Sequence, residues 1–97
     1  MGHEEFLRLC KAKVAEYTND HMDITDKRQV NVNDVYVVWS CKTLQNSKAL
    51  LSTTVPDGMY YELTYNGDKN ELYMDAYKKF ENRCFKMQEE ENEKKSN

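Results

Sequence analysis

The side chains that could do chemistry near neutral pH are the two histidines and three cysteines: His3, His21, Cys10, Cys41 and Cys84. Cys10 and His21 share one side of a predicted helix, but the eleven residues between them correspond to about 16 Å along its axis. They cannot form a Cys-His pair within that helix, and nothing in the sequence places another cysteine beside a histidine. We therefore predict no catalytic residues, and a small enzyme is the weakest of the functions considered.

Oxygen-bearing side chains gather in two stretches, around residues 20–26 and in the Asn-Gly-Asp-Lys-Asn sequence of residues 66–70. Calcium loops need several oxygen ligands at fixed spacing and a glycine at the turn, and neither stretch has that pattern. The three glycines lie far apart, so no glycine-rich phosphate loop is present. We expect ordinary polar loops, no metal site and no cofactor.

The composition bounds the cell compartment and the class of partner. An odd number of cysteines without CxxC spacing predicts small hydrophobic side chains in a reducing cytoplasm, not a disulfide framework. The N-terminal residues lack the pattern of a signal peptide, and no apolar stretch approaches the ~20 residues that span a bilayer. A net charge of −3 argues against binding to nucleic acid, since phosphate contacts need a basic surface.

The elements that must position any site begin with a helix over residues 3–21. Its apolar side follows spacings of three, four and seven residues, through Phe6, Leu7, Cys10, Val14, Tyr17 and His21. Glu4 and Glu5 lie in the first turn, where the helix dipole favours acidic side chains. His3 is expected in a frayed terminus. Residues 23–26 predict a loop, because short polar side chains compete there for backbone hydrogen bonds.

The middle of the chain predicts four antiparallel strands, separated by turn residues. β-Branched and aromatic residues favour strands over residues 35–44, 48–55, 59–65 and 71–80, with turns at 45–47, 56–58 and 66–70. A helix with Asn33 or Asp34 as N-cap competes with the first strand. Val35, Val37 and Val38 disfavour that helix, because branching at Cβ restricts their side chains.

The register of the last two strands follows from parity. An even loop places Met59, Tyr61 and Leu63 on the same face as Leu72, Met74 and Ala76, whereas an odd loop would split them between two faces. A two-residue turn within residues 66–69 or a four-residue loop over 67–70 is therefore predicted. The fold is α+β: an N-terminal helix packed on a four-stranded antiparallel meander. We expect a single domain over residues 1–87 and an acidic tail over residues 88–97 that is disordered or forms a frayed helix end.

Tyrosine is unusually frequent, with seven in 97 residues. The alternation predicts that the polar sheet face carries a tyrosine-rich set with two acidic neighbours: Tyr36, Tyr60, Tyr73, Tyr77, Glu62 and Asp75. Tyrosine combines a large rigid contact area with a polar tip, which suits a protein interface. Two structural alternatives stay open: the tyrosines form cross-strand pairs that stiffen the sheet, or they pack under the helix. The predicted partner-binding residues are Tyr60, Tyr73, Tyr77, Glu62 and Asp75.

Two strings of the middle segment are specific enough to suggest a relationship. Val-Trp-Ser-Cys-Lys-Thr-Leu-Gln-Asn-Ser-Lys-Ala-Leu and Tyr-Tyr-Glu-Leu-Thr-Tyr-Asn-Gly-Asp-Lys resemble a family of small proteins of unknown function from phages and prophages of Gram-positive bacteria. The resemblance covers roughly residues 30–82. It implies a phage or prophage accessory protein that works in the bacterial host cytoplasm, and no activity is assigned to that family. From the residues we expect a non-enzymatic interaction protein that binds a host or phage protein, such as a defence-system component. The alternative is a structural homodimer with no host target.

Overall fold

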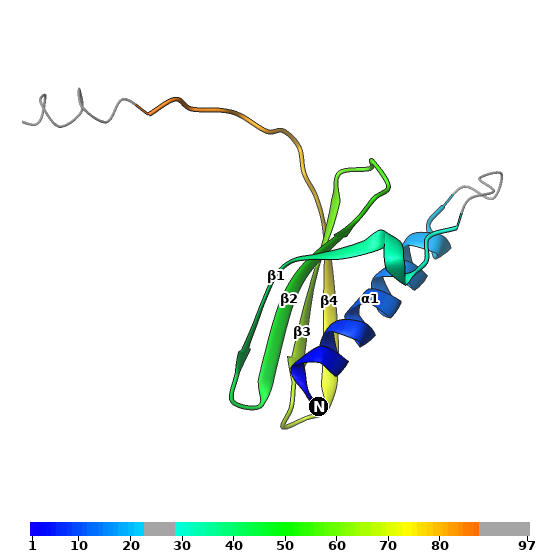
Figure 1. Cartoon of the computed structure of the whole chain (residues 1–97), viewed down its shortest axis with the longest axis vertical. Coiled ribbons are helices and arrows are strands. Elements are labelled where there is room, and N and C mark those ends of the chain that lie inside the picture. The colour runs from blue at the N-terminus through cyan, green and yellow to red at the C-terminus, as the bar shows by residue number, and fades with distance from the viewer. Residues whose placement is uncertain (23–28, 88–97) are drawn as a thin grey trace, which may run out of the picture.

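A computed structural model describes residues 1–22 and 29–87 and confirms the predicted α+β fold (Figure 1). The chain runs through α1 (His3–Asp20), a short 3-10 helix η1 (Val32–Asp34), β1 (Val35–Thr43), β2 (Asn46–Thr53), β3 (Met59–Asn66) and β4 (Glu71–Lys78). The strands form one antiparallel sheet in the order β1-β2-β3-β4, so every sequential pair is also a spatial pair. The predicted loop at residues 23–26 and the predicted tail at 88–97 lie outside the described residues.

Helix α1 packs its apolar side on the sheet, as its spacing predicts. Phe6, Cys10 and Val14 are fully buried, and Tyr17 is half-buried at the far end. His21 is the exposed C-cap residue, and its ring stacks on that of Tyr17 at 4.0 Å, so it lies on the same side of the helix as predicted. One expectation at the start of the helix is wrong. His3 is half-buried rather than frayed, since its Nε2 lies 2.9 Å from Ser40 Oγ on β1.

The alternative helix at residues 33 and 34 is wrong, although a capping sequence does occur there. Asn31 is the N-cap of η1, where its Oδ1 accepts from Asn33 N at 2.8 Å and its own N–H donates to Asp34 Oδ2 at 3.1 Å. The helical turn lasts only three residues before β1 begins at Val35. The run of valines stops the helix from continuing, because β-branched side chains favour extended backbone.

The first hairpin is tighter than the sequence suggested. β2 begins at Asn46, not at residue 48, and Asn46 and Ser47 pair with Thr43 and Lys42. The turn is Leu44–Gln45, and Leu44 takes positive φ (55°) although it is not a glycine. The prediction placed the turn at residues 45–47 because these residues are polar. Asn46 and Ser47 nevertheless belong to β2, since the backbone pairing of a strand does not require apolar side chains. β4 likewise ends at Lys78, two residues earlier than expected.

The register of β3 and β4 is the one that parity predicted. Tyr61 pairs with Ala76 and Leu63 with Met74, around a four-residue loop at residues 67–70 that follows the Asn66–Glu71 pair. The buried core lies between this face of the sheet and α1, and its largest fully buried side chains are Tyr61, Phe6, Leu51, Leu63, Val14 and Cys10.

A bulge interrupts β1. Val37 pairs with Leu51 and Trp39 pairs with Leu50, so Val38 falls between two consecutive partners and has none of its own. The extra residue reverses the alternation of side chains along the rest of the strand. Val35 and Val37 therefore point toward α1, whereas Trp39 points away from it.

Candidate functional site

The face of the sheet opposite α1 is the candidate site. No described element covers this open face, because α1 lies along the other side of the sheet (Figure 1). Three rows of paired residues run across it from β1 to β4: Tyr36–Ser52–Tyr60–Tyr77, Trp39–Leu50–Glu62–Asp75 and Cys41–Lys48–Thr64–Tyr73. Five aromatic rings thus share one uncovered surface.

The structure places all five predicted binding residues on this open face. Tyr73 and Tyr77 are 53% and 51% exposed, while Tyr60 and Glu62 are partly covered by their neighbours. The alternative that these tyrosines pack under the helix is wrong. Cross-strand pairing does occur, since Tyr60 lies directly opposite Tyr77. Their role in binding stays a prediction.

Sequence reasoning missed two residues of the open face, Trp39 and Leu50. Trp39 is 43% exposed, and it lies beside Leu50 in the middle row. Simple alternation from Val35 and Val37 would have pointed Trp39 toward α1, but the bulge at Val38 turns it outward. A run of consecutive apolar residues such as 35–39 gives no sign of where a bulge falls, so the sequence held no clear signal.

Acidic groups surround the tyrosine hydroxyls of the open face. Tyr77 OH donates to Glu62 Oε1 at 3.3 Å, and Tyr73 OH donates to Glu71 Oε1. The charge of Asp75, followed by that of Glu62, raises the pKa of Tyr77, and the hydrogen bond to Glu71 raises the pKa of Tyr73. Both phenols therefore stay protonated and serve as donors. Lys48 is the cation of these rows, and its Nζ lies 3.5 Å from Glu62 Oε2.

The three cysteines lie in different surroundings. Cys10 is buried in the core, where desolvation raises the pKa of its thiol to about 12. Cys41 and Cys84 are exposed and unbridged. Across residues 1–22 and 29–87, no three His, Cys, Asp or Glu side chains gather as a metal site would require. In the same residues no helix has the length and apolar character needed to cross a membrane.

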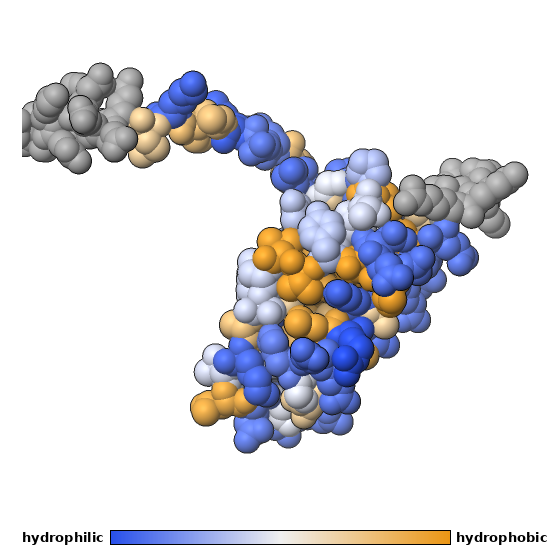
Figure 2. Space-filling view, viewed as in Figure 1, coloured by the Kyte–Doolittle hydropathy of each residue, from blue (hydrophilic) through white to orange (hydrophobic). Residues whose placement is uncertain are grey.

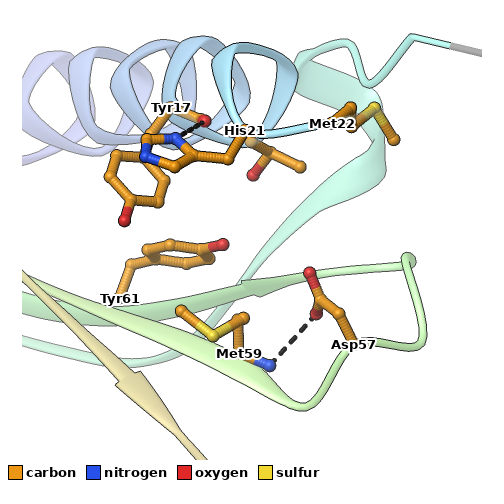
Figure 3. Close-up of a pocket in the computed structure, with 7 residues that line it drawn as sticks. Tyr17, His21, Met22, Asp57, Met59 and Tyr61 are labelled. Carbon is orange, nitrogen blue, oxygen red and sulfur yellow. Dashed lines mark hydrogen bonds between the residues drawn. The ribbon is translucent and has the colours of Figure 1, made fainter. Parts of the chain in front are cut away.

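A cavity of about 280 Å³ opens between the end of α1 and the start of β3 (Figure 3). The rings of Tyr17 and His21 stack at 4.0 Å, and the ring of Tyr61 meets Tyr17 edge-on at 5.5 Å. The polar groups here already hold structural hydrogen bonds: His21 Nδ1 donates to the Tyr17 carbonyl at 2.9 Å, and Asp57 Oδ1 accepts from Met59 N at 3.0 Å. The cavity offers an apolar recess rather than an acid–base pair.

Comparison with protein families gives a match over most of the chain. The model of a family of unknown function, DUF6275, matches residues 7–87. The chain belongs to the DUF6275 family. The match takes in most of α1, the four strands with the open face, and the segment that follows β4. Searches of the curated proteins and of the solved structures gave no match. The family assignment therefore relates the part of the chain that carries the open face to other proteins, but it assigns no activity to that part.

Proposed function

We propose that the chain is a non-enzymatic interaction protein whose open face binds another protein. The observation that carries the proposal is the cluster of Tyr36, Trp39, Tyr60, Tyr73 and Tyr77 on a sheet face that no described element covers. Tyrosine and tryptophan provide a large, rigid contact area at a low cost in conformational entropy, which is why they dominate binding surfaces. A sheet face that served only to meet water would not need them.

The charges favour a protein over a nucleic acid as the partner. Aromatic sheet faces also stack nucleic-acid bases, but such faces combine the rings with positive charge that follows the phosphates. Here Glu62, Asp75 and Glu71 outnumber Lys48. An acidic, aromatic surface is complementary to a protein patch that carries Lys or Arg beside apolar side chains.

The biological setting of this proposal rests on the resemblance of residues 30–82 to phage and prophage proteins. We place the chain in the bacterial cytoplasm as an accessory protein of a phage or prophage. Its partner is then a host or phage protein, and a component of a defence system is one candidate.

An affinity capture with matched variants tests the proposal. Immobilised wild-type chain, the open-face variant Tyr73→Ala/Tyr77→Ala and the control Leu44→Asn are incubated with a lysate of a Gram-positive bacterium, and retained proteins are quantified. Leu44 is 87% exposed at a hairpin tip, so its replacement removes apolar surface away from the open face. We expect a partner that the wild type and the control retain and the open-face variant loses, with affinity lower by about fivefold or more. A set of captured proteins that is the same for all three chains contradicts the proposal.

A further inference from the structure

Residues 79–87 form an arm that leaves the folded body after β4. The arm has no helix or strand, and Figure 1 shows it running away from the sheet. Its root is fixed, because Lys79 N donates to the Gly58 carbonyl at 2.8 Å. Beyond that bond, Phe80, Phe85 and Met87 are 95%, 73% and 79% exposed. Figure 2 shows apolar patches among hydrophilic ones along the projecting segment. Three large, exposed apolar side chains on nine residues form a surface suited to a partner.

The arm and the open face are complementary in chemistry. The arm carries three cations, Lys79, Arg83 and Lys86, against one acid, Glu81. The open face carries an excess of acids in Glu62, Asp75 and Glu71, together with aromatic rings that are about half exposed. Opposite charges set around matching apolar groups favour association of the two surfaces.

The geometry directs the arm to a second molecule. Asn82 is the one residue of the arm that commonly forms turns, and in the structure the arm makes no turn and runs away from its own sheet (Figure 1). Nine extended residues reach about 30 Å, whereas four strands span only about 14 Å between the outer two. An arm continuing outward can therefore cross the full width of a neighbouring sheet.

We infer that the arm of one copy, residues 79–87, lies across the open face of a second copy, and that the second arm returns the contact. The exchange is symmetric, so it closes as a dimer. The inference rests on the proposed role of the open face as a protein-binding surface and names its first occupant. The arm of a second copy and any other partner protein then compete for the open face. In the dimer the open face of each copy is covered by the arm of the other.

The mass of the full chain in solution tests the exchange. Light scattering coupled to size exclusion, over a concentration series, should give twice the 11.5 kDa of one chain. The arm variant Phe80→Ser/Phe85→Ser and the open-face variant Tyr73→Ala/Tyr77→Ala should each raise the dissociation constant by about tenfold or more. Leu44→Asn, which removes an apolar side chain that is 87% exposed elsewhere, should leave the dissociation constant unchanged. A wild type that stays monomeric, including one whose arm folds onto its own sheet, overturns the inference. So does a dimer that the arm variant leaves intact.

Mixing the two variants separates arm exchange from other modes of dimerisation. A mixed pair keeps one contact between an intact arm and an intact open face, and both sets of substitutions fall in its other contact. Where each set abolishes the contact it touches, the mixture should form dimers at concentrations at which either variant alone is monomeric. A mixture that stays monomeric contradicts the exchange. If the wild type is monomeric but the open-face variant loses its captured protein, the proposed function survives without the dimer. If the dimer forms and the open-face variant captures the same proteins as the wild type, the dimer stands and the proposed function fails.

Discussion

Asn19, near the end of α1, exchanges two hydrogen bonds with the backbone of Val30. The Asn19 Nδ2 group donates to the Val30 carbonyl and the Val30 N–H donates to Asn19 Oδ1, both at 2.8 Å. Val30 is 5% exposed, so water cannot easily replace either bond. This one side chain satisfies both backbone groups of the residue that leads into η1 and β1, and it fixes the helix to the first strand.

Replacing Asn19 should therefore destabilise the fold more than its half-buried position suggests. Asn19→Ala leaves a buried donor and a buried acceptor without partners, which should lower the free energy of unfolding by about 1–3 kcal/mol. The adjacent, exposed Asp20→Ala serves as control and should change it by less than about 0.5 kcal/mol. Urea denaturation followed by circular dichroism measures both. Equal midpoints for the two variants would show that the double hydrogen bond does not stabilise the fold.

Val14 tests the packing of α1 on the sheet. Val14 is fully buried, so Val14→Asp places a charge in the core without a partner and should cost about 3 kcal/mol or more, enough to unfold a marginal domain. Ala12→Asp puts the same side chain on the exposed side of the helix and should cost no more than about 0.7 kcal/mol. Thermal melts compare the two. A Val14→Asp protein that melts within about 3 °C of wild type rules out this packing.

Gly67 tests the contact between the two hairpin turns. A Cβ at Gly67 would lie 2.9 Å from the Cβ of Gln45 and closer still to its carbonyl oxygen, in backbone that cannot easily move. Gly67→Ala should thus cost about 1–3 kcal/mol. Gly2→Ala, with no atom within 4 Å of the added carbon, should be nearly neutral. Denaturant midpoints measure the stability of both variants. A Gly67→Ala protein as stable as the wild type would mean that the two turns are not in close contact.

The three cysteines should differ in reactivity. Burial raises the pKa of Cys10 to about 12, so this thiol stays protonated and inaccessible at mildly alkaline pH, whereas Cys41 and Cys84 are exposed. A chromogenic disulfide reagent added to dilute protein should therefore titrate two thiols rapidly, and the third only after denaturation. Cys10→Ser should leave the rapid count unchanged. Rapid reaction of all three thiols in the folded protein would show that α1 does not cover Cys10.

The features that the sequence predicted well are those governed by repeated patterns. The spacing of Phe6, Cys10 and Val14 located the buried side of α1, because a helix repeats every 3.6 residues. Parity fixed the register of β3 against β4, since only an even loop places Leu63 and Met74 on one face. The position of Tyr60, Tyr73 and Tyr77 on the open face followed from that register.

The features that the sequence missed depend on single residues or on distant contacts. The bulge at Val38, which brings Trp39 onto the open face, adds one residue to a run that is apolar throughout. Leu44 takes the left-handed turn position where a glycine or asparagine would have signalled it. The bond of His3 to Ser40 joins residues that are 37 positions apart, so no local pattern announces it.

The bulge also makes the two edges of the sheet unequal. β1 and β4 are the outer strands, but Val38 breaks the ladder of β1, whereas β4 pairs regularly along its eight residues. An interrupted edge is a poor template for a strand from another molecule. The bulge therefore makes β1 a poorer edge than β4 for pairing with a strand of another molecule, so β4 is the more regular of the two edges that such a strand would meet.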